Sequence, residues 1–135
     1  MRRHYFLLLT VALAACHSAG APAPREAAFD QEIQLAPGER ALFGPRKLDV
    51  EFVRVVEDSR CPTDVTCVWA GEVKVQLATR SGGAEAVQHE LTAGKPAAVG
   101  GLQLDVVQVQ PERISTREIA AHEYRVTLQA RDSKP

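Results

Sequence analysis

The residues with the most chemical potential gather in one short stretch, Asp58 to Gly71. It holds Cys61 and Cys67 in a C-x5-C spacing, followed by the single tryptophan of the chain, Trp69. Such a thiol pair could form a disulfide, bind zinc or exchange electrons. Redox pairs are typically C-x-x-C at a helix start, and zinc sites need paired C-x2–4-C units or nearby histidines. The sequence has neither pattern, so we interpret the pair as a structural disulfide.

The side chains around the cysteines also allow two interpretations each. Arg60 could bridge the carboxylate of Asp58 or of Asp64 and fix the shape of the loop. A carboxylate pair for acid–base catalysis is the weaker interpretation. Pro62 fixes one φ angle and stiffens the loop. Trp69 is predicted to pack in the core beside the disulfide, and the alternative is an exposed aromatic anchor for a partner.

The rest of the chain offers little for catalysis. His89 falls on the apolar face of a strand pattern, where a half-buried, hydrogen-bonded histidine is expected rather than a ligand. No serine lies in a G-x-S-x-G context, and no Gly-rich phosphate loop occurs. We therefore predict that the protein is not an enzyme and holds no metal or cofactor. Its 16 basic and 17 acidic residues form no basic stripe, which argues against nucleic-acid binding.

The N-terminus has the features of an export signal. A basic start precedes an apolar run of eleven residues, 5–15, which is too short to span a bilayer. The run ends in Leu13-Ala14-Ala15-Cys16, which resembles the lipobox of bacterial lipoproteins. The resemblance implies cleavage after residue 15 and lipid on Cys16, so that the membrane is a partner. An ordinary signal peptide with an incidental cysteine is the alternative.

This interpretation divides the chain into four parts. Residues 1–15 are the signal peptide, 16–28 the lipidated N-terminus and a flexible linker, 29–131 one β domain, and 132–135 a tail. The linker is rich in alanine and proline. His17, rather than an aspartate, follows the lipidated cysteine. By resemblance to Gram-negative lipoproteins this favours the outer membrane, facing the periplasm, over the inner membrane. Such an oxidising compartment suits the disulfide.

Alternating apolar and polar residues predict strand after strand. The candidates are 29–35, 41–43, 47–56, 72–80, 85–92, 102–110 and 124–130. In 47–56 and 102–110 the apolar residues change face midway, which indicates a bulge or a strand covered on both sides. Residues 111–122 are expected to hold one helical turn, with Ser115 and Glu118 as its cap. About seven strands with short links predict an all-β fold, an antiparallel β-sandwich or a small barrel.

The segment D-S-R-C-P-x(4)-C-V-W-x-G, residues 58–71, resembles a group of small, uncharacterised bacterial envelope lipoproteins. The ending Tyr124 to Leu128 is also similar. The resemblance spans about residues 30–130 and implies an extracytoplasmic β domain, with no activity attached.

Together these features predict a lipid-anchored, non-catalytic β domain that binds an envelope protein or a small ligand, or supports envelope structure. The loop 58–71 is the candidate contact surface. The alternative is an inhibitor of an envelope protease, in which the stiff loop presents Arg60 to a trypsin-like pocket and Pro62 resists cleavage.

Overall fold

The computed structural model describes residues 20–133, and the signal segment with Cys16 lies outside the described residues. Nine strands and one short 3₁₀ helix make up this part of the chain. The strands are β1 (Arg25–Ala27), β2 (Glu32–Leu35), β3 (Arg40–Phe43), β4 (Leu48–Asp58), β5 (Val73–Arg80), β6 (Val87–Thr92), β7 (Ala97–Val99), β8 (Leu102–Gln110) and β9 (Arg125–Asp132). The helix η1 spans Ala121–Glu123.

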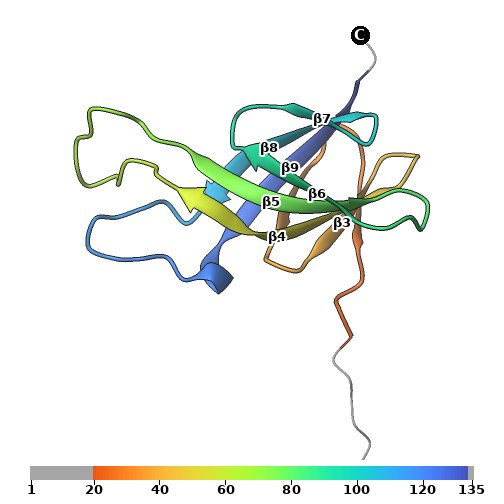
Figure 1. Cartoon of the computed structure of the whole chain (residues 1–135), viewed down its shortest axis with the longest axis horizontal. Helices are drawn as coiled ribbons and strands as arrows, with labels where there is room; N and C mark the ends of the chain where they lie inside the picture. Colours follow the sequence, from red (N-terminus) through yellow and green to blue (C-terminus); the bar gives the residue numbers. More distant parts are fainter. Residues whose placement is uncertain (1–19, 134–135) are drawn as a thin grey trace, which may run out of the picture.

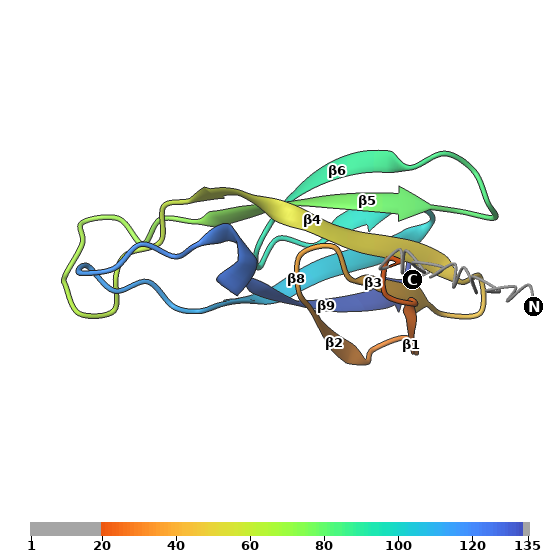
Figure 2. The same cartoon turned by 90° about the horizontal axis from the view of Figure 1, so that it is seen from below.

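The strands form two sheets packed face to face, as Figures 1 and 2 show. One sheet has the order β1-β3-β4-β5-β6 and the other β2-β9-β8-β7. Every pairing is antiparallel except that of β1 with β3. Apolar side chains from both inner faces fill the space between the sheets, Phe43, Phe52 and Leu128 among them. The predicted all-β sandwich is confirmed.

The alternation in the sequence places the core side chains. In β4, Leu48, Val50 and Phe52 are buried while the residues between them are partly exposed. The predicted change of face is a bulge: the register of β4 against β5 shifts after Phe52 and again after Val55. In β8 the register shifts between Val106 and Gln108.

Three predictions about the elements are wrong in detail. The linker was expected to run to residue 28, but Arg25–Ala27 pairs with β3, and the Arg25 guanidinium donates to the carbonyl of Gln34. The β7 strand was not predicted. The cap at Ser115 does not form, and the helical turn lies later, where the Ala120 N–H donates to the Glu123 carboxylate at 2.8 Å.

Two connections extend beyond one end of the sandwich (Figures 1 and 2). The first, residues 59–72 between β4 and β5, is called the tip. The second, residues 111–120 between β8 and η1, is called the brace. Within residues 20–133, no helix is long and apolar enough to cross a membrane.

Candidate functional site

The base of the tip continues the hairpin of β4 and β5. The Ser59 N–H donates to the Glu72 carbonyl at 2.8 Å, and the Cys61 N–H donates to the Ala70 carbonyl at 3.0 Å. This narrow ladder depends on Gly71, whose φ is +67°. A Cβ at that position would lie 1.8 Å from the Ser59 carbonyl oxygen. A residue without a side chain is therefore required here.

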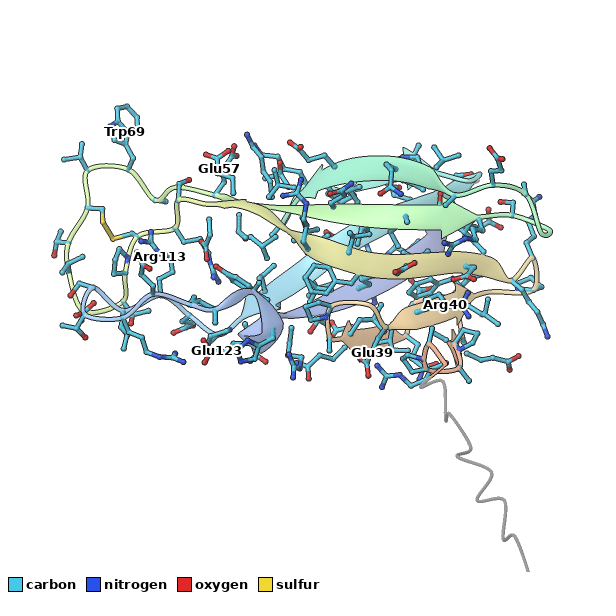
Figure 3. All side chains as sticks on the ribbon, turned by 60° about the horizontal axis from the view of Figure 1, so that its bottom comes forward. Glu39, Arg40, Glu57, Trp69, Arg113 and Glu123 are labelled. Atoms are coloured by element: carbon cyan, nitrogen blue, oxygen red, sulfur yellow. A yellow bond between two sulfur atoms is a disulfide. The ribbon has the colours of Figure 1, made fainter. Side chains whose placement is uncertain are left out.

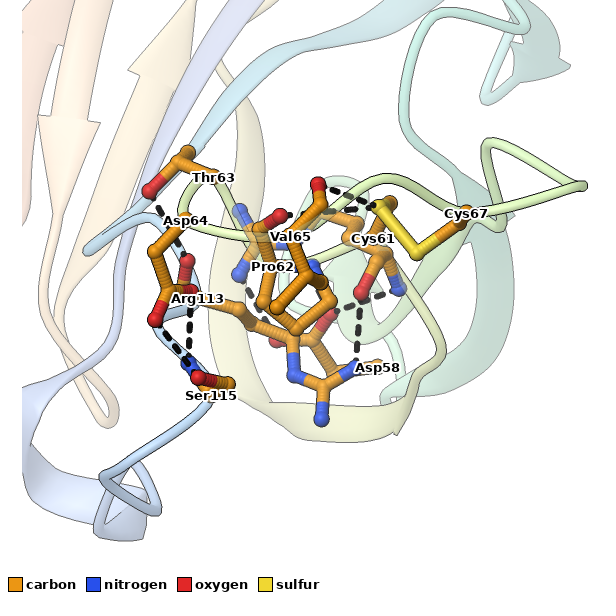
Figure 4. The surroundings of a disulfide bond; sticks show 10 residues. Asp58, Cys61, Pro62, Thr63, Asp64, Val65, Cys67, Arg113 and Ser115 are labelled. Atoms are coloured by element: carbon orange, nitrogen blue, oxygen red, sulfur yellow. Dashed lines mark hydrogen bonds and ion pairs between the residues drawn. A yellow bond between two sulfur atoms is a disulfide. The ribbon is translucent and has the colours of Figure 1, made fainter.

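The predicted disulfide is present. Cys61 and Cys67 are bonded, with their Cα atoms 5.9 Å apart, as in ordinary protein disulfides. Pro62 follows Cys61 and begins a turn that the Val65 N–H closes by donating to the Pro62 carbonyl. Figure 4 shows the disulfide on one side of this turn and the brace on the other. The loop is thus closed covalently across its outer part and by hydrogen bonds at its base.

Arg60 ties the tip to the second sheet. Its Nε and Nη2 donate to the two oxygens of Asp58 at 2.7 and 2.6 Å. Its Nη1 also donates to the Val109 carbonyl at 2.7 Å, and its Nη2 to the Pro111 carbonyl at 3.0 Å. The paired side chains of Arg60 and Asp58 are 20% and 8% exposed. The expected bridge by Arg60 therefore forms with Asp58 and runs inward.

Arg60 points inward to the outer edge of β8, part of which β7 leaves unpaired. The edge strand β7 pairs with β8 only as far as Leu104. Beyond it, the Gly94 N–H donates to the Val106 carbonyl at 3.0 Å, and Arg60 donates to the Val109 carbonyl. A turn and a guanidinium thus cover the outer edge of β8, which would otherwise be open to another strand.

Tyr124 completes this buried polar group. Its hydroxyl donates to Asp58 Oδ2 at 3.0 Å. Burial raises the pKa of Asp58, but the hydrogen bonds and charge of Arg60, with the bond from Tyr124, outweigh it and hold the pKa below its ordinary value. Burial, followed by the hydrogen bond to Asp58, raises the pKa of Tyr124 to about 12. Both shifts indicate that Asp58 is charged and Tyr124 neutral at neutral pH.

The brace holds the outer part of the tip. Asp64 accepts hydrogen bonds from the Ser115 N–H at 2.8 Å and from its hydroxyl at 2.5 Å. The bonds from Ser115 keep the pKa of Asp64 below its ordinary value. The Thr63 N–H donates to the Arg113 carbonyl at 2.9 Å, and Arg113 Nη1 donates to the Arg60 carbonyl at 2.7 Å. Two loops about fifty residues apart in sequence therefore form one unit (Figure 4).

The outer end of the tip is apolar and exposed. Val68 is 93% exposed, Trp69 83% and Val65 46%. In Figure 3 the Trp69 side chain projects away from the sandwich. The prediction that Trp69 packs in the core is wrong, because the loop extends past the ends of both sheets and no layer covers it. The alternative interpretation, an exposed aromatic, describes its position.

The polar side chains of the tip and its surroundings are hydrogen-bonded to one another. The Asp58 and Asp64 carboxylates are each engaged by their own partners, Arg60 with Tyr124 and Ser115. Within residues 20–133, no group of three or more His, Cys, Asp or Glu side chains is placed to hold a metal ion. His89 is half-buried, and its Nε2 lies 3.0 Å from the Thr79 hydroxyl. The tip exposes Val65, Val68 and Trp69 to solvent, together with the polar side chains of Thr63, Asp64 and Thr66.

Comparison with known proteins adds no relative. No family model, curated protein or solved structure matches this chain. The class of protein defined by the fold is an all-β sandwich with a disulfide-closed, braced loop at one end. The resemblance of residues 58–71 to envelope lipoproteins stays a prediction.

Sequence reasoning missed four residues that shape the site: Gly71, Arg113, Ser115 and Tyr124. The glycine had a detectable signal, because it closes a short hairpin connection two residues before a strand. The other three contact residues 50 to 66 positions away. Local spacing carries no information about such pairs.

Proposed function

We propose that this protein is a lipid-anchored, extracytoplasmic, non-catalytic binding domain that uses its tip to contact another component of the envelope. The observation that carries the proposal is the exposure of Val68 and Trp69 at the end of a loop that is itself held rigidly. Large aromatic side chains are common anchors of binding sites. Both side chains lie outside the hydrophobic core of the described residues.

Rigidity makes such a contact stronger. A loop that is already ordered loses little conformational entropy on binding. The disulfide restrains residues 61–67, Arg60 fixes the base, and Asp64 joins the outer part to the brace. The tip therefore resembles a preorganised contact surface more than a mobile connection.

The proposed location rests on Cys16 and on the disulfide. The lipobox-like residues 13–16 support attachment by lipid, and a stable disulfide suits an oxidising compartment. We place the domain in the periplasm, attached to the outer membrane. Purification from cells and mass measurement of the N-terminal peptide tests the lipid on Cys16, and its absence contradicts the anchor.

The protease-inhibitor alternative loses its main support. It required Arg60 to enter a trypsin-like pocket of the protease. The guanidinium instead binds Asp58 and the carbonyls of Val109 and Pro111. Presenting Arg60 would break four hydrogen bonds and uncover a buried carboxylate, which is costly.

The test is site-specific photo-cross-linking in cells. A photoreactive residue replaces Val68 in one variant and Val87 in a matched control. Val87 is also exposed but lies at the end of β6 that is remote from the tip. We expect Val68 to capture an envelope component that Val87 does not, and Trp69→Ala to weaken the capture. Identical products from both positions contradict the proposal.

A further inference from the structure

We infer that the tip binds the interfacial layer of a lipid bilayer, with Val68 and Trp69 inserted. The inference rests on the proposed function, because it names the occupant of the same surface. Tryptophan is enriched at membrane interfaces, where its ring is in an apolar layer and its N–H remains near polar groups. Val68, beside it, is nearly fully exposed.

The outer part of the tip contains a run of residues without charge. Residues 65–71, V-T-C-V-W-A-G, carry no ionisable side chain apart from the disulfide-bonded Cys67. The nearest charged residues flank this segment: Asp64, which accepts two hydrogen bonds from Ser115, and Glu72, which forms ion pairs with Lys74 and Lys95. Because residues 65–71 have no ionised side chain of their own, their insertion avoids the main cost of entering a bilayer, provided that Asp64 stays at the polar surface.

The shape of the tip also suits a bilayer. Val68 and Trp69 stand on a protruding loop, and Figure 3 shows the Trp69 side chain pointing outward from it. A protein partner would need a matching concave pocket, whereas a fluid bilayer adapts to a convex surface. The rigid frame of Arg60 and the disulfide holds the two side chains out together.

The length of chain that precedes β1 is compatible with contact between the tip and the membrane. In the first sheet, Arg25 of β1 is paired with Ala41 of β3, which is paired with Val50 of β4. From Val50 to Asp58, the last residue of β4, is eight residues, or about 26 Å along the strand. From Cys16 to Arg25 the chain takes nine residue-to-residue steps, with a reach of about 30 Å. If Cys16 is lipidated, a domain inclined toward the bilayer can touch it with the tip.

This tether also lowers the affinity that the tip needs. A second contact on a short linker acts at a high effective concentration. The tip would then set the orientation of the domain on the surface.

The charge around the tip predicts which bilayer it prefers. Residues 57–74 and 111–123 contain seven acidic and four basic side chains, a net charge of −3. Anionic lipids would repel this end of the molecule. We therefore expect binding to vesicles of phosphatidylcholine and phosphatidylethanolamine, and weaker binding when phosphatidylglycerol is added.

The experiment uses the fluorescence of Trp69, the one tryptophan in the chain. The mature protein, purified with the anchor it carries in cells, is reconstituted into vesicles with brominated acyl chains. We expect a blue-shifted emission that bromine near the headgroups quenches more than bromine near the chain ends. Val68→Asp should lower the ratio of inserted to free tips about tenfold or more.

The matched control moves the tryptophan. In Trp69→Phe/Val87→Trp the fluorophore lies on β6, away from the tip, and should stay unquenched by bromolipid. Equal quenching of the two proteins, or Trp69 emission as water-exposed as that of the control, overturns the inference. So does stronger insertion on adding phosphatidylglycerol.

The two proposals fail separately. If Trp69 remains in water but Val68 cross-links a specific protein in cells, the bilayer inference falls and the binding function stands. If Trp69 remains in water and Val68 cross-links no specific protein, both proposals are wrong.

Discussion

Replacing Arg60 tests the network on which the tip depends. Arg60→Ala removes two charge-assisted bonds to Asp58 and two bonds to carbonyls of β8 and the brace. It leaves a carboxylate whose side chain is 8% exposed beside the Tyr124 hydroxyl. Breaking a fully buried ion pair costs 3–5 kcal/mol, and Arg60 keeps a fifth of its side chain in water. We expect a loss of about 3 kcal/mol, the lower end of that range.

For a domain of this size, 1 kcal/mol corresponds to about 4 °C in Tm. Arg60→Ala should therefore lower the Tm by about 12 °C, measured by circular dichroism at neutral pH. Arg60→Lys keeps the charge but cannot form the two-pronged bond, so its loss should be intermediate. A double-mutant cycle with Asp58→Asn should give a coupling of about 1 kcal/mol or more. If the Tm decreases by less than about 4 °C and the double-mutant cycle shows no coupling, this account of the network is wrong.

Three further predictions concern the same region. The folded-state pKa of Asp58 is lowered, so its charge stabilises the protein above its ordinary pKa of 3.8 and the benefit disappears as pH falls through the lowered value. Between neutral and acid pH, the free energy of unfolding should therefore change less in Asp58→Asn than in wild type. Identical pH dependence in the two proteins would argue against the ion pair. The raised pKa of Tyr124 stabilises the fold below pH 10 and this is lost as pH rises through about 12. Ultraviolet difference titration against Tyr124→Phe should show one tyrosine ionising near pH 12, and ionisation near pH 10 contradicts the hydrogen bond. Gly71→Ala should cost about 3 kcal/mol by urea unfolding because its Cβ meets the Ser59 carbonyl, whereas Gly82→Ala, with a similar φ but open space, should cost about 1 kcal/mol. Equal costs would mean that the close approach is relieved elsewhere.

The sequence predicts the sandwich because its strands are half-buried. Alternation in 72–80 and 102–110 matches β5 and β8 closely, since one face of each strand packs in the core. β1 and β7 were missed because each is three residues long, too short for a periodic pattern. Both are ordered by pairing with a longer neighbour. Such order is a tertiary effect that local sequence does not contain.

The sequence predicted the disulfide of the site but not the contacts that the tip makes with the brace and with Tyr124. The cysteine pair is close in sequence, so spacing was sufficient to predict the disulfide. Spacing also placed Arg60 beside two carboxylates, but it did not decide between Asp58 and Asp64. Trp69 was misplaced because residue type predicts burial only where another layer is available to cover the side chain. The contacts of Ser115 and Tyr124 depend on how the two sheets align the ends of β4 and β8, which a pattern of apolar residues does not encode.

The place of β9 in the second sheet determines when folding can finish. β9 lies between β2 and β8 and pairs with both, yet it is the last strand of the chain. Until residues 125–132 are available, β2 has no strand to pair with and β8 pairs only with β7. A nascent or translocating chain therefore stays incomplete until its C-terminal end arrives.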